Sequence, residues 1–81
     1  MTYYVYILKS IKYPDKIYVG YTSNIDQRMD THNSGESIYT KKYKPWILLN
    51  HVTFSDQTKA VIFEQYLKSG SGKEFLKNTV V

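Results

Sequence analysis

Cysteine is absent from this chain of 81 residues, and glycine and proline are scarce, with four and two residues. Without cysteine, neither a disulfide framework nor a thiolate zinc site can form. That absence is compatible with a reducing compartment, and we expect a cytoplasmic protein. No apolar run approaches the roughly 20 residues that span a membrane, and no basic region precedes an apolar one at the N-terminus. We therefore expect neither a membrane span nor a signal peptide.

What is present is a short, basic chain that is rich in tyrosine. Its 81 residues leave room for one hydrophobic core, so we expect a single domain over residues 1–81. The apolar fraction of 42% is too high for a disordered chain. A net charge of +4 makes a polyanion a candidate partner, because phosphate contacts would supply most of the affinity. The nine tyrosines suit either stacking on nucleic-acid bases or a small core in which the rings are buried and the hydroxyl groups reach solvent.

Two short strands joined by a polar loop open the chain. Residues 3–8 and 16–22 are rich in aromatic and β-branched side chains, which suit a half-buried sheet. In the loop between them, Pro14 presets its own φ angle and Asp15 can bond to nearby backbone groups. The pattern predicts a β-hairpin.

Tyr6 and Tyr18 lie one on each predicted strand, an even number of residues apart. In a hairpin without a bulge, this parity places both phenols on one face of the sheet. Gly20 leaves a bare patch on that face, which suggests a bulge or another group that approaches the backbone closely. The two phenols are either the start of a functional site or an aromatic pair that stabilises the hairpin by about 0.2–1 kcal/mol.

A helix is expected after the hairpin. Ser23 is a suitable N-cap, Asp26 completes a pattern similar to a capping box, and Gly35 provides a stop. Ile25 and Met29 are four residues apart, so they would lie on the buried stripe. The pattern predicts an amphipathic helix between Ser23 and Gly35.

Arg28 and His32 are also four residues apart and share a face of that helix beside the stripe. The helix is entered directly from Gly20, so the pair would project toward the C-terminal edge of the hairpin. Two interpretations stay open. The pair is either a solvated basic face or a site that holds an anion, since arginine suits bidentate contact with phosphate.

Residues 34–45 show no clear period and mix basic with aromatic side chains. The segment is long for a connection in so small a domain, which favours a function over a plain mobile loop. Such mixtures are typical of loops that bind nucleic acid. The candidate nucleic-acid-binding residues in this segment are Tyr39, Lys41, Lys42 and Lys44.

Residues 46–54 form a third predicted strand, whose apolar run is continuous enough for a central position or one covered on both faces. A helix over residues 57–69 follows, capped by residues 55–56 and ended by Gly70. A last short helix is expected to open at Ser71 with a capping box.

Glu64 lies on the apolar face of the helix over residues 57–69, four residues after Ala60 and three before Leu67. A carboxylate is costly to bury unless it is paired or binds a metal. The local pattern leaves two interpretations equally open. Glu64 either holds a metal or lies at the edge of the stripe, where it reaches solvent or pairs with Lys68 at i+4.

Two short motifs in the predicted hairpin resemble those of the GIY-YIG nuclease family. Tyr4-Val5-Tyr6 is similar to the first motif and Tyr18-Val19-Gly20 to the second, at the usual short spacing. The chain departs from the family pattern at Tyr4, where the first motif normally has Gly, and more mildly at Val5, where it has Ile.

Three further positions extend the resemblance over nearly the whole chain. Arg28 matches the family's arginine on the first helix, His32 a frequent companion one turn later, and Glu64 the metal-binding glutamate on a later helix. The order of the predicted strands and helices also agrees. The resemblance implies an α+β fold, with a small three-stranded antiparallel sheet flanked by helices in the order β-β-α-β-α-α.

The activity that this resemblance implies is hydrolysis of DNA phosphodiester bonds with one divalent cation. Glu64 would hold Mg²⁺ or Mn²⁺, hard cations that keep several waters and take few carboxylates. Arg28 would stabilise the charge that develops on the phosphoryl oxygens. Tyr6 or Tyr18 would position or deprotonate the attacking water, assisted by His32 or by a lysine near Lys41. A phenol with a reference pKa near 10 needs the metal or another nearby cationic group to act as a base at neutral pH.

Three functions follow as hypotheses. The first is a nuclease that acts on DNA rather than RNA, on branched, nicked or single-stranded forms, with a link to DNA repair or recombination. Characterised relatives usually carry a further DNA-binding domain, so the activity would be weak, selective for a DNA structure, or dependent on a protein partner that supplies specificity. The second is a non-catalytic module that binds nucleic acid on the same scaffold. The third is a protein-interaction domain whose aromatic-rich face meets a partner chain.

Overall fold

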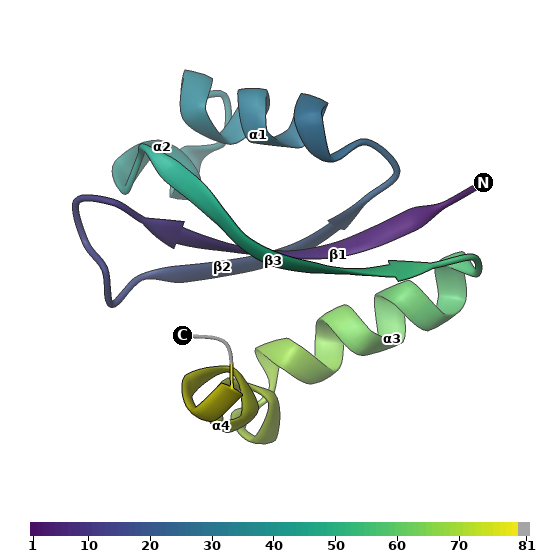
Figure 1. Ribbon diagram of the computed structural model, residues 1–81. Helices are drawn as coiled ribbons and strands as arrows, with labels where there is room; N and C mark the ends of the chain where they lie inside the picture. The colour runs from purple at the N-terminus through teal and green to yellow at the C-terminus, as the bar shows by residue number, and fades with distance from the viewer. Residues whose placement is uncertain (80–81) are drawn as a thin grey trace.

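The computed structural model describes residues 1–79, and within them one strand, β1 (Tyr3–Ser10), lies at the centre of an antiparallel sheet. It pairs with β2 (Ile17–Thr22) on one side and with β3 (Trp46–Phe54) on the other. The helices that accompany this sheet are α1 (Ile25–Ser34), α2 (Ile38–Lys42), α3 (Gln57–Lys68) and α4 (Gly70–Thr79). Figure 1 shows α1 and α2 on one face of the sheet and α3 and α4 on the other. The predicted α+β fold is confirmed.

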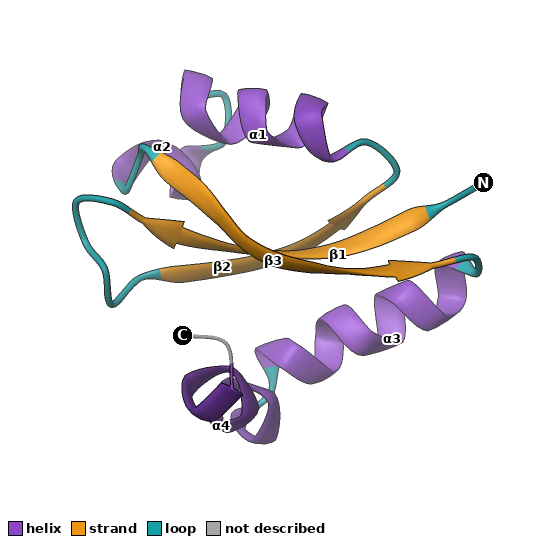
Figure 2. Cartoon of the chain, viewed as in Figure 1, coloured by secondary structure: helices purple, strands orange, loops and turns teal. Residues whose placement is uncertain are grey.

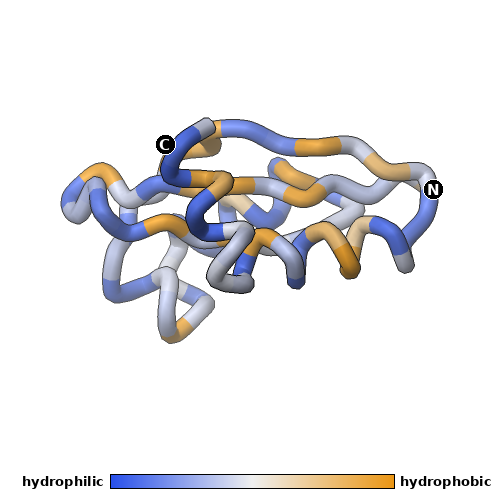
Figure 3. Tube along the Cα trace, turned by 90° about the horizontal axis from the view of Figure 1, so that it is seen from below, coloured by the Kyte–Doolittle hydropathy of each residue, from blue (hydrophilic) through white to orange (hydrophobic). Residues whose placement is uncertain are grey.

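The alternation of side chains along β1 divides the core into two clusters, because successive residues of a strand point to opposite faces. Val5 and Ile7 point toward α3 and α4, where they pack with apolar residues of β2 and both helices. Tyr6 and Leu8 point toward α1 and α2, where they pack with Trp46. In Figure 3, where the trace is coloured by hydropathy, apolar and polar stretches alternate along the chain.

The register of the hairpin agrees with the parity prediction. Tyr6 lies opposite Gly20 and Leu8 lies opposite Tyr18, with no shift along the β1–β2 pairing. Tyr6 and Tyr18 consequently point to the same face, and both contribute to the cluster beneath α1 and α2. The sheet does contain an irregularity, but it lies in β3, where the register slips by one residue near Leu49.

The position predicted for β3 is wrong, because β3 lies at an edge of the sheet. The strand order β2-β1-β3 leaves its outer side unpaired within the sheet. Ile47 and Leu48, in the apolar run that suggested a covered strand, are 44% and 38% exposed. A run of apolar residues reports hydrophobicity alone, and this property does not distinguish a central strand from an edge strand.

The first helix ends as predicted but begins one residue later. Gly35 has a φ angle of 87°, a left-handed conformation that terminates α1. The N-cap is Asn24 instead of the predicted Ser23, and its side-chain oxygen accepts a hydrogen bond of 3.0 Å from the backbone N–H of Gln27. Asp26 consequently lies one position too early to close a capping box.

The segment over residues 34–45 contains a short helix, α2, which the sequence pattern did not predict (Figure 2). Its five residues are too few to establish a helical period, so no periodic signal was available. The beginning of α3 is as predicted, with Asp56 as its N-cap. The last helix begins at Gly70, and the capping interaction comes from Ser69, whose hydroxyl accepts from the backbone N–H of Gly72.

No helix within residues 1–79 is both long enough and apolar enough to cross a bilayer. The longest of those that the structure describes is α3, with 12 residues.

Helix α4 packs against the end of α3 through a glycine. A Cβ atom placed on Gly72 would collide with the backbone carbonyl of Tyr66 and the Cα atom of Leu67. Backbone atoms cannot rotate out of the way as a flexible side chain can. Gly72 therefore permits the close approach of the two helices, whereas a Cβ atom at Gly70 would meet nothing within 4 Å.

We expect Gly72→Ala to lower the free energy of unfolding by about 1–3 kcal/mol, as overpacked sites do. The loss should appear even though alanine favours a helix interior by about 1 kcal/mol over glycine. Gly70→Ala is the matched control and should change stability by about 0.5 kcal/mol or less. Urea unfolding followed by circular dichroism measures both, and an equal effect of the two substitutions would contradict the packing argument.

Candidate functional site

The two phenols of the hairpin lie side by side on the face of the sheet beneath α1 and α2. Their ring centroids are 6.4 Å apart. Tyr6 is buried, with 3% of its surface exposed, whereas Tyr18 is half-buried. The ring of Tyr6 lies across Gly20, where an added Cβ atom would collide with the phenol oxygen. The predicted close approach to Gly20 is therefore made by Tyr6 itself.

A buried chain of hydrogen bonds joins this hairpin to the helices above it. The phenol oxygen of Tyr6 lies 3.0 Å from Nε2 of His32, and Nδ1 of His32 lies 3.0 Å from Oγ1 of Thr40. The Thr40 hydroxyl donates in turn to the backbone carbonyl of Ser37. All of these groups are satisfied when His32 carries its proton on Nδ1, so that Nε2 accepts from the Tyr6 hydroxyl.

Burial shifts the pKa values of both partners toward their neutral forms. Desolvation, followed by the charge of Tyr18, raises the pKa of Tyr6 to about 12, with a further contribution from Glu64 and an opposing one from Arg28. Desolvation also lowers the pKa of His32, and the positive charge of Arg28 lowers it further. At neutral pH, a neutral phenol therefore donates to a neutral imidazole.

Arg28 lies on α1 one turn before His32, and its side chain is exposed. Its charge acts on the pKa of both Tyr6 and His32, so the guanidinium lies near the buried pair. The two side chains of the predicted Arg28/His32 face differ in their burial. His32 is 2% exposed and belongs to the interior, while Arg28 is free to meet an anion from solvent.

Glu64 comes from the opposite layer of the molecule, because α3 packs on the other face of the sheet. Its side chain is only 14% exposed, and Oε2 lies 3.4 Å from Nζ of Lys68. Nζ of Lys68 lies 5.7 Å from the ring centroid of Tyr18. Because β2 is an edge strand, Lys68 reaches past it to Tyr18, and the carboxylate of Glu64 lies next to Lys68.

A divalent cation is compatible with this donor set only in a sparsely ligated form. No group of three or more His, Cys, Asp or Glu side chains that could enclose a metal occurs within residues 1–79. Glu64 supplies one largely buried carboxylate, whose recorded ion pair is to a lysine side chain that is 48% exposed. Such a weak pair is readily exchanged. One carboxylate fits Mg²⁺, which keeps most of its waters and takes one or two protein carboxylates.

The predicted basic segment adjoins this site through one aromatic side chain. The ring centroid of Tyr39, on α2, is 6.0 Å from that of Tyr18. Lys41 and Lys44 are exposed on and just after α2, and Nζ of Lys42 lies 5.6 Å from the ring centroid of Tyr43. The segment thus places an aromatic ring beside the phenols and exposed ammonium groups farther out.

Two residues of this arrangement were missed by the sequence analysis. Thr40 orients His32, yet a threonine inside an aperiodic segment carries no signal of that role. Lys68 appeared only as a partner for Glu64, whereas in the structure it also lies over the ring of Tyr18. At the departure from the first motif, the ring of Tyr4 packs edge-on against that of His51 with centroids 5.6 Å apart, so its bulk lies away from Gly20.

Comparison with known proteins identifies relatives along almost the entire chain. A family model described as the GIY-YIG catalytic domain matches residues 2–78. A UPF0213 protein of Staphylococcus haemolyticus is 37% identical over 76 residues, which are 93% of this chain and 90% of that protein. A UPF0213 protein of Natronomonas pharaonis is 32% identical over 68 residues, which are 83% of this chain and 78% of that protein.

The fold is also found in a solved structure. A UPF0213 protein from Bacillus halodurans, determined by solution NMR, superimposes with a TM-score of 0.58 at 33% sequence identity. The match covers 96% of this chain and 84% of that one. These comparisons agree with the two hairpin motifs and with the order of elements around them. The chain belongs to the GIY-YIG family, a family of nucleases.

Proposed function

We propose that this chain is a metal-dependent endonuclease that hydrolyses DNA phosphodiester bonds, acting as a single domain. The observation that carries the proposal is the position of Lys68, the ion-pair partner of Glu64 on α3, over the ring of Tyr18 at the edge of β2. The charge of Glu64 also raises the pKa of Tyr6. A carboxylate that can hold a cation and an arginine that can stabilise developing charge supply two functions that phosphodiester hydrolysis uses, and a phenol can supply the base. A link to DNA repair or recombination, with a protein partner that supplies specificity, is part of the same proposal.

The role we assign to Tyr18 is to orient the attacking water and, in its phenolate form, to take the proton of that water and become the neutral phenol. Tyr18 is the more accessible of the two phenols, whereas Tyr6 is buried and held neutral by its raised pKa. The water oxygen forms a bond to phosphorus, the bond from phosphorus to the leaving oxygen breaks, and a proton from solvent restores the leaving hydroxyl. Arg28, exposed above the site, stabilises the extra negative charge on the phosphoryl oxygens.

Glu64 is the residue that would hold Mg²⁺ or Mn²⁺. A bound divalent cation supplies Lewis-acid stabilisation of the phosphoryl and leaving oxygens. Lys68 would give up its contact with Glu64 when the cation binds, since a pair whose lysine is 48% exposed contributes about 1 kcal/mol or less. Tyr6 and His32 are positioning residues, because their hydrogen bond fixes the hairpin beneath α1.

Glu64→Gln should abolish cleavage of labelled DNA in the presence of Mg²⁺ or Mn²⁺, with a loss of at least about a hundredfold. Glutamine keeps the size of the side chain and removes the negative charge that attracts the cation. Glu36→Gln makes the same chemical change at an exposed position and should cleave as the wild type does. Equal cleavage by wild type and Glu64→Gln would sink the proposal. Retained DNA binding without cleavage by the wild type would instead favour the non-catalytic module.

The roles of the two phenols should become distinguishable when each tyrosine is replaced by phenylalanine. Tyr18→Phe keeps the ring and removes the proposed base, so cleavage should fall by about 100- to 10,000-fold with little change in stability. Tyr6→Phe leaves His32 without its donor in a buried site, so it should cost about 1–3 kcal/mol of unfolding free energy. Cleavage assays and urea unfolding on both variants test the division of roles, and unchanged cleavage in Tyr18→Phe would refute it.

The buried imidazole predicts an acid-sensitive fold. Because the pKa of His32 is lowered in the folded state, the unfolded chain binds the extra proton as pH falls below about 6.5. The contribution of the neutral imidazole to the free energy of unfolding is therefore present above that pH and is lost below it, by up to about 1.4 kcal/mol per pH unit. His32→Gln should flatten this dependence in urea unfolding, whereas His51→Gln, at an exposed position, should keep it.

A further inference from the structure

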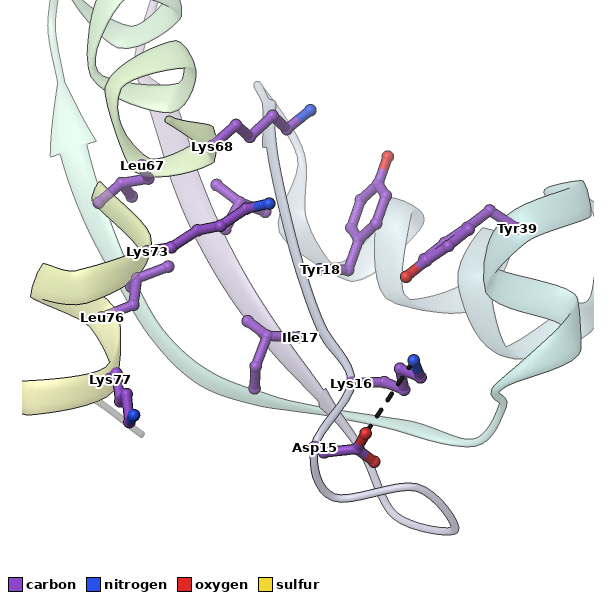
Figure 4. Close-up of a pocket in the computed structure, with 11 residues that line it drawn as sticks. Asp15, Lys16, Ile17, Tyr18, Tyr39, Leu67, Lys68, Lys73, Leu76 and Lys77 are labelled. Carbon is purple, nitrogen blue, oxygen red and sulfur yellow. Dashed lines mark ion pairs between the residues drawn. The ribbon is translucent and has the colours of Figure 1, made fainter. Parts of the chain in front are cut away.

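A groove of about 580 Å³ lies between β2 and the pair of helices α3 and α4, on the side of β2 away from β1. Its volume falls within the range of about 300–1,000 Å³ that is usual for small-molecule sites. In Figure 4, Lys68 and Lys73 extend from their helices toward β2, while Tyr18 and Tyr39 lie on the opposite side of that strand. The groove therefore opens directly beside the phenol that we propose as the catalytic base.

The charge of the groove is strongly unbalanced. Four lysines line it with a single acidic residue, Asp15, which lies 4.0 Å from Nζ of Lys16. Lys73 and Lys77 are four residues apart on α4, so they share one face of the helix. Neither of the ion pairs recorded within residues 1–79 involves them. Two adjacent ammonium groups on an open rim, without a recorded ion pair in the described part of the chain, are suited to successive phosphates.

The floor of the groove is apolar, so it favours a ligand that has an apolar part as well as phosphate groups. Ile17, Leu67 and Leu76 line it beneath the lysines. At its other side, Tyr39 is 48% exposed and offers a ring face. A duplex buries its bases and presents phosphates and groove edges, so it would leave these surfaces without partners. An unpaired base has an exposed π-face that stacks on aromatic side chains.

We propose that this groove binds the unpaired nucleotides of a single strand next to the phosphodiester bond that is cleaved. Lys73 and Lys77 hold phosphates of that strand, and Tyr39 stacks on one of its bases. Tyr18 belongs both to the groove and to the phenol pair, so a strand lying in the groove passes the proposed catalytic base. The inference rests on the proposed nuclease function and assigns its substrate as a strand that is unpaired on one side of the cut.

Binding of a labelled oligothymidine strand to the full chain, in EDTA so that no cleavage occurs, tests this assignment by fluorescence anisotropy over a series of salt concentrations. The double variant Lys73→Gln/Lys77→Gln should weaken binding by about tenfold or more, and should reduce the slope of log K against log salt by about 1.4 for two lost contacts. Tyr39→Ala should weaken single-strand binding by about fivefold or more while leaving that slope unchanged.

The matched control is Lys12→Gln/Lys59→Gln, which changes two exposed lysines outside the groove and, like the groove variant, lowers the net charge from +4 to +2. It should keep near-wild-type affinity for the single strand. The groove variant should lose less affinity for a duplex that contains the same strand than for the single strand itself. The proposal is overturned if both lysine pairs lose affinity equally, if the groove variant binds as the wild type does, or if duplex binding suffers more.

These outcomes separate the groove from the nuclease. Metal-dependent cleavage by the wild type, with binding indifferent to Lys73 and Lys77, would retain the nuclease and refute the groove. Single-strand binding that depends on Lys73 and Lys77, in a chain that cuts no DNA with Mg²⁺ or Mn²⁺, would refute the nuclease and retain the groove as a binding site.

Discussion

The contact between Tyr6, Gly20 and His32 is the constraint on which the packing of α1 and α2 against the sheet depends. The ring of Tyr6 can lie flat across β2 only because Gly20 has no side chain, and its hydroxyl then reaches Nε2 of His32. The other imidazole nitrogen continues to Thr40, whose carbonyl accepts from Nε1 of Trp46. A fully satisfied polar network therefore fastens α1 and α2 to the sheet and orders this face.

The edge position of β2 has the largest consequence for function. The phenols and Glu64 belong to opposite layers of the molecule, and an inner strand would have kept them apart. Because β2 ends the sheet, Lys68 of α3 passes the strand and lies over the ring of Tyr18. The same free edge forms one wall of the lysine-lined groove. Both the proposed catalytic centre and the proposed strand-binding site are therefore products of strand order.

Local sequence patterns predicted the helices and strands themselves better than they predicted what each element packs against. The parity of Tyr6 and Tyr18, the stop at Gly35 and the cap at Asp56 each depend on a few adjacent residues, and the structure agrees with them. The covered position expected for β3 failed, because pairing with a partner strand is not encoded in hydrophobicity. The helix α2 was missed because five residues carry no period.

The sequence by itself determined which side chains share a strand face or a helix face, because these follow from the fixed geometry of each element. It thereby specified the two phenols on one face and the position of Glu64 on its helix. Only the tertiary structure decided that His32 is buried while Arg28 is exposed, and that lysines from α3, α4 and the β1–β2 loop border one groove. Those outcomes depend on how distant segments pack, and the periodicity of a single element contains no information about its neighbours.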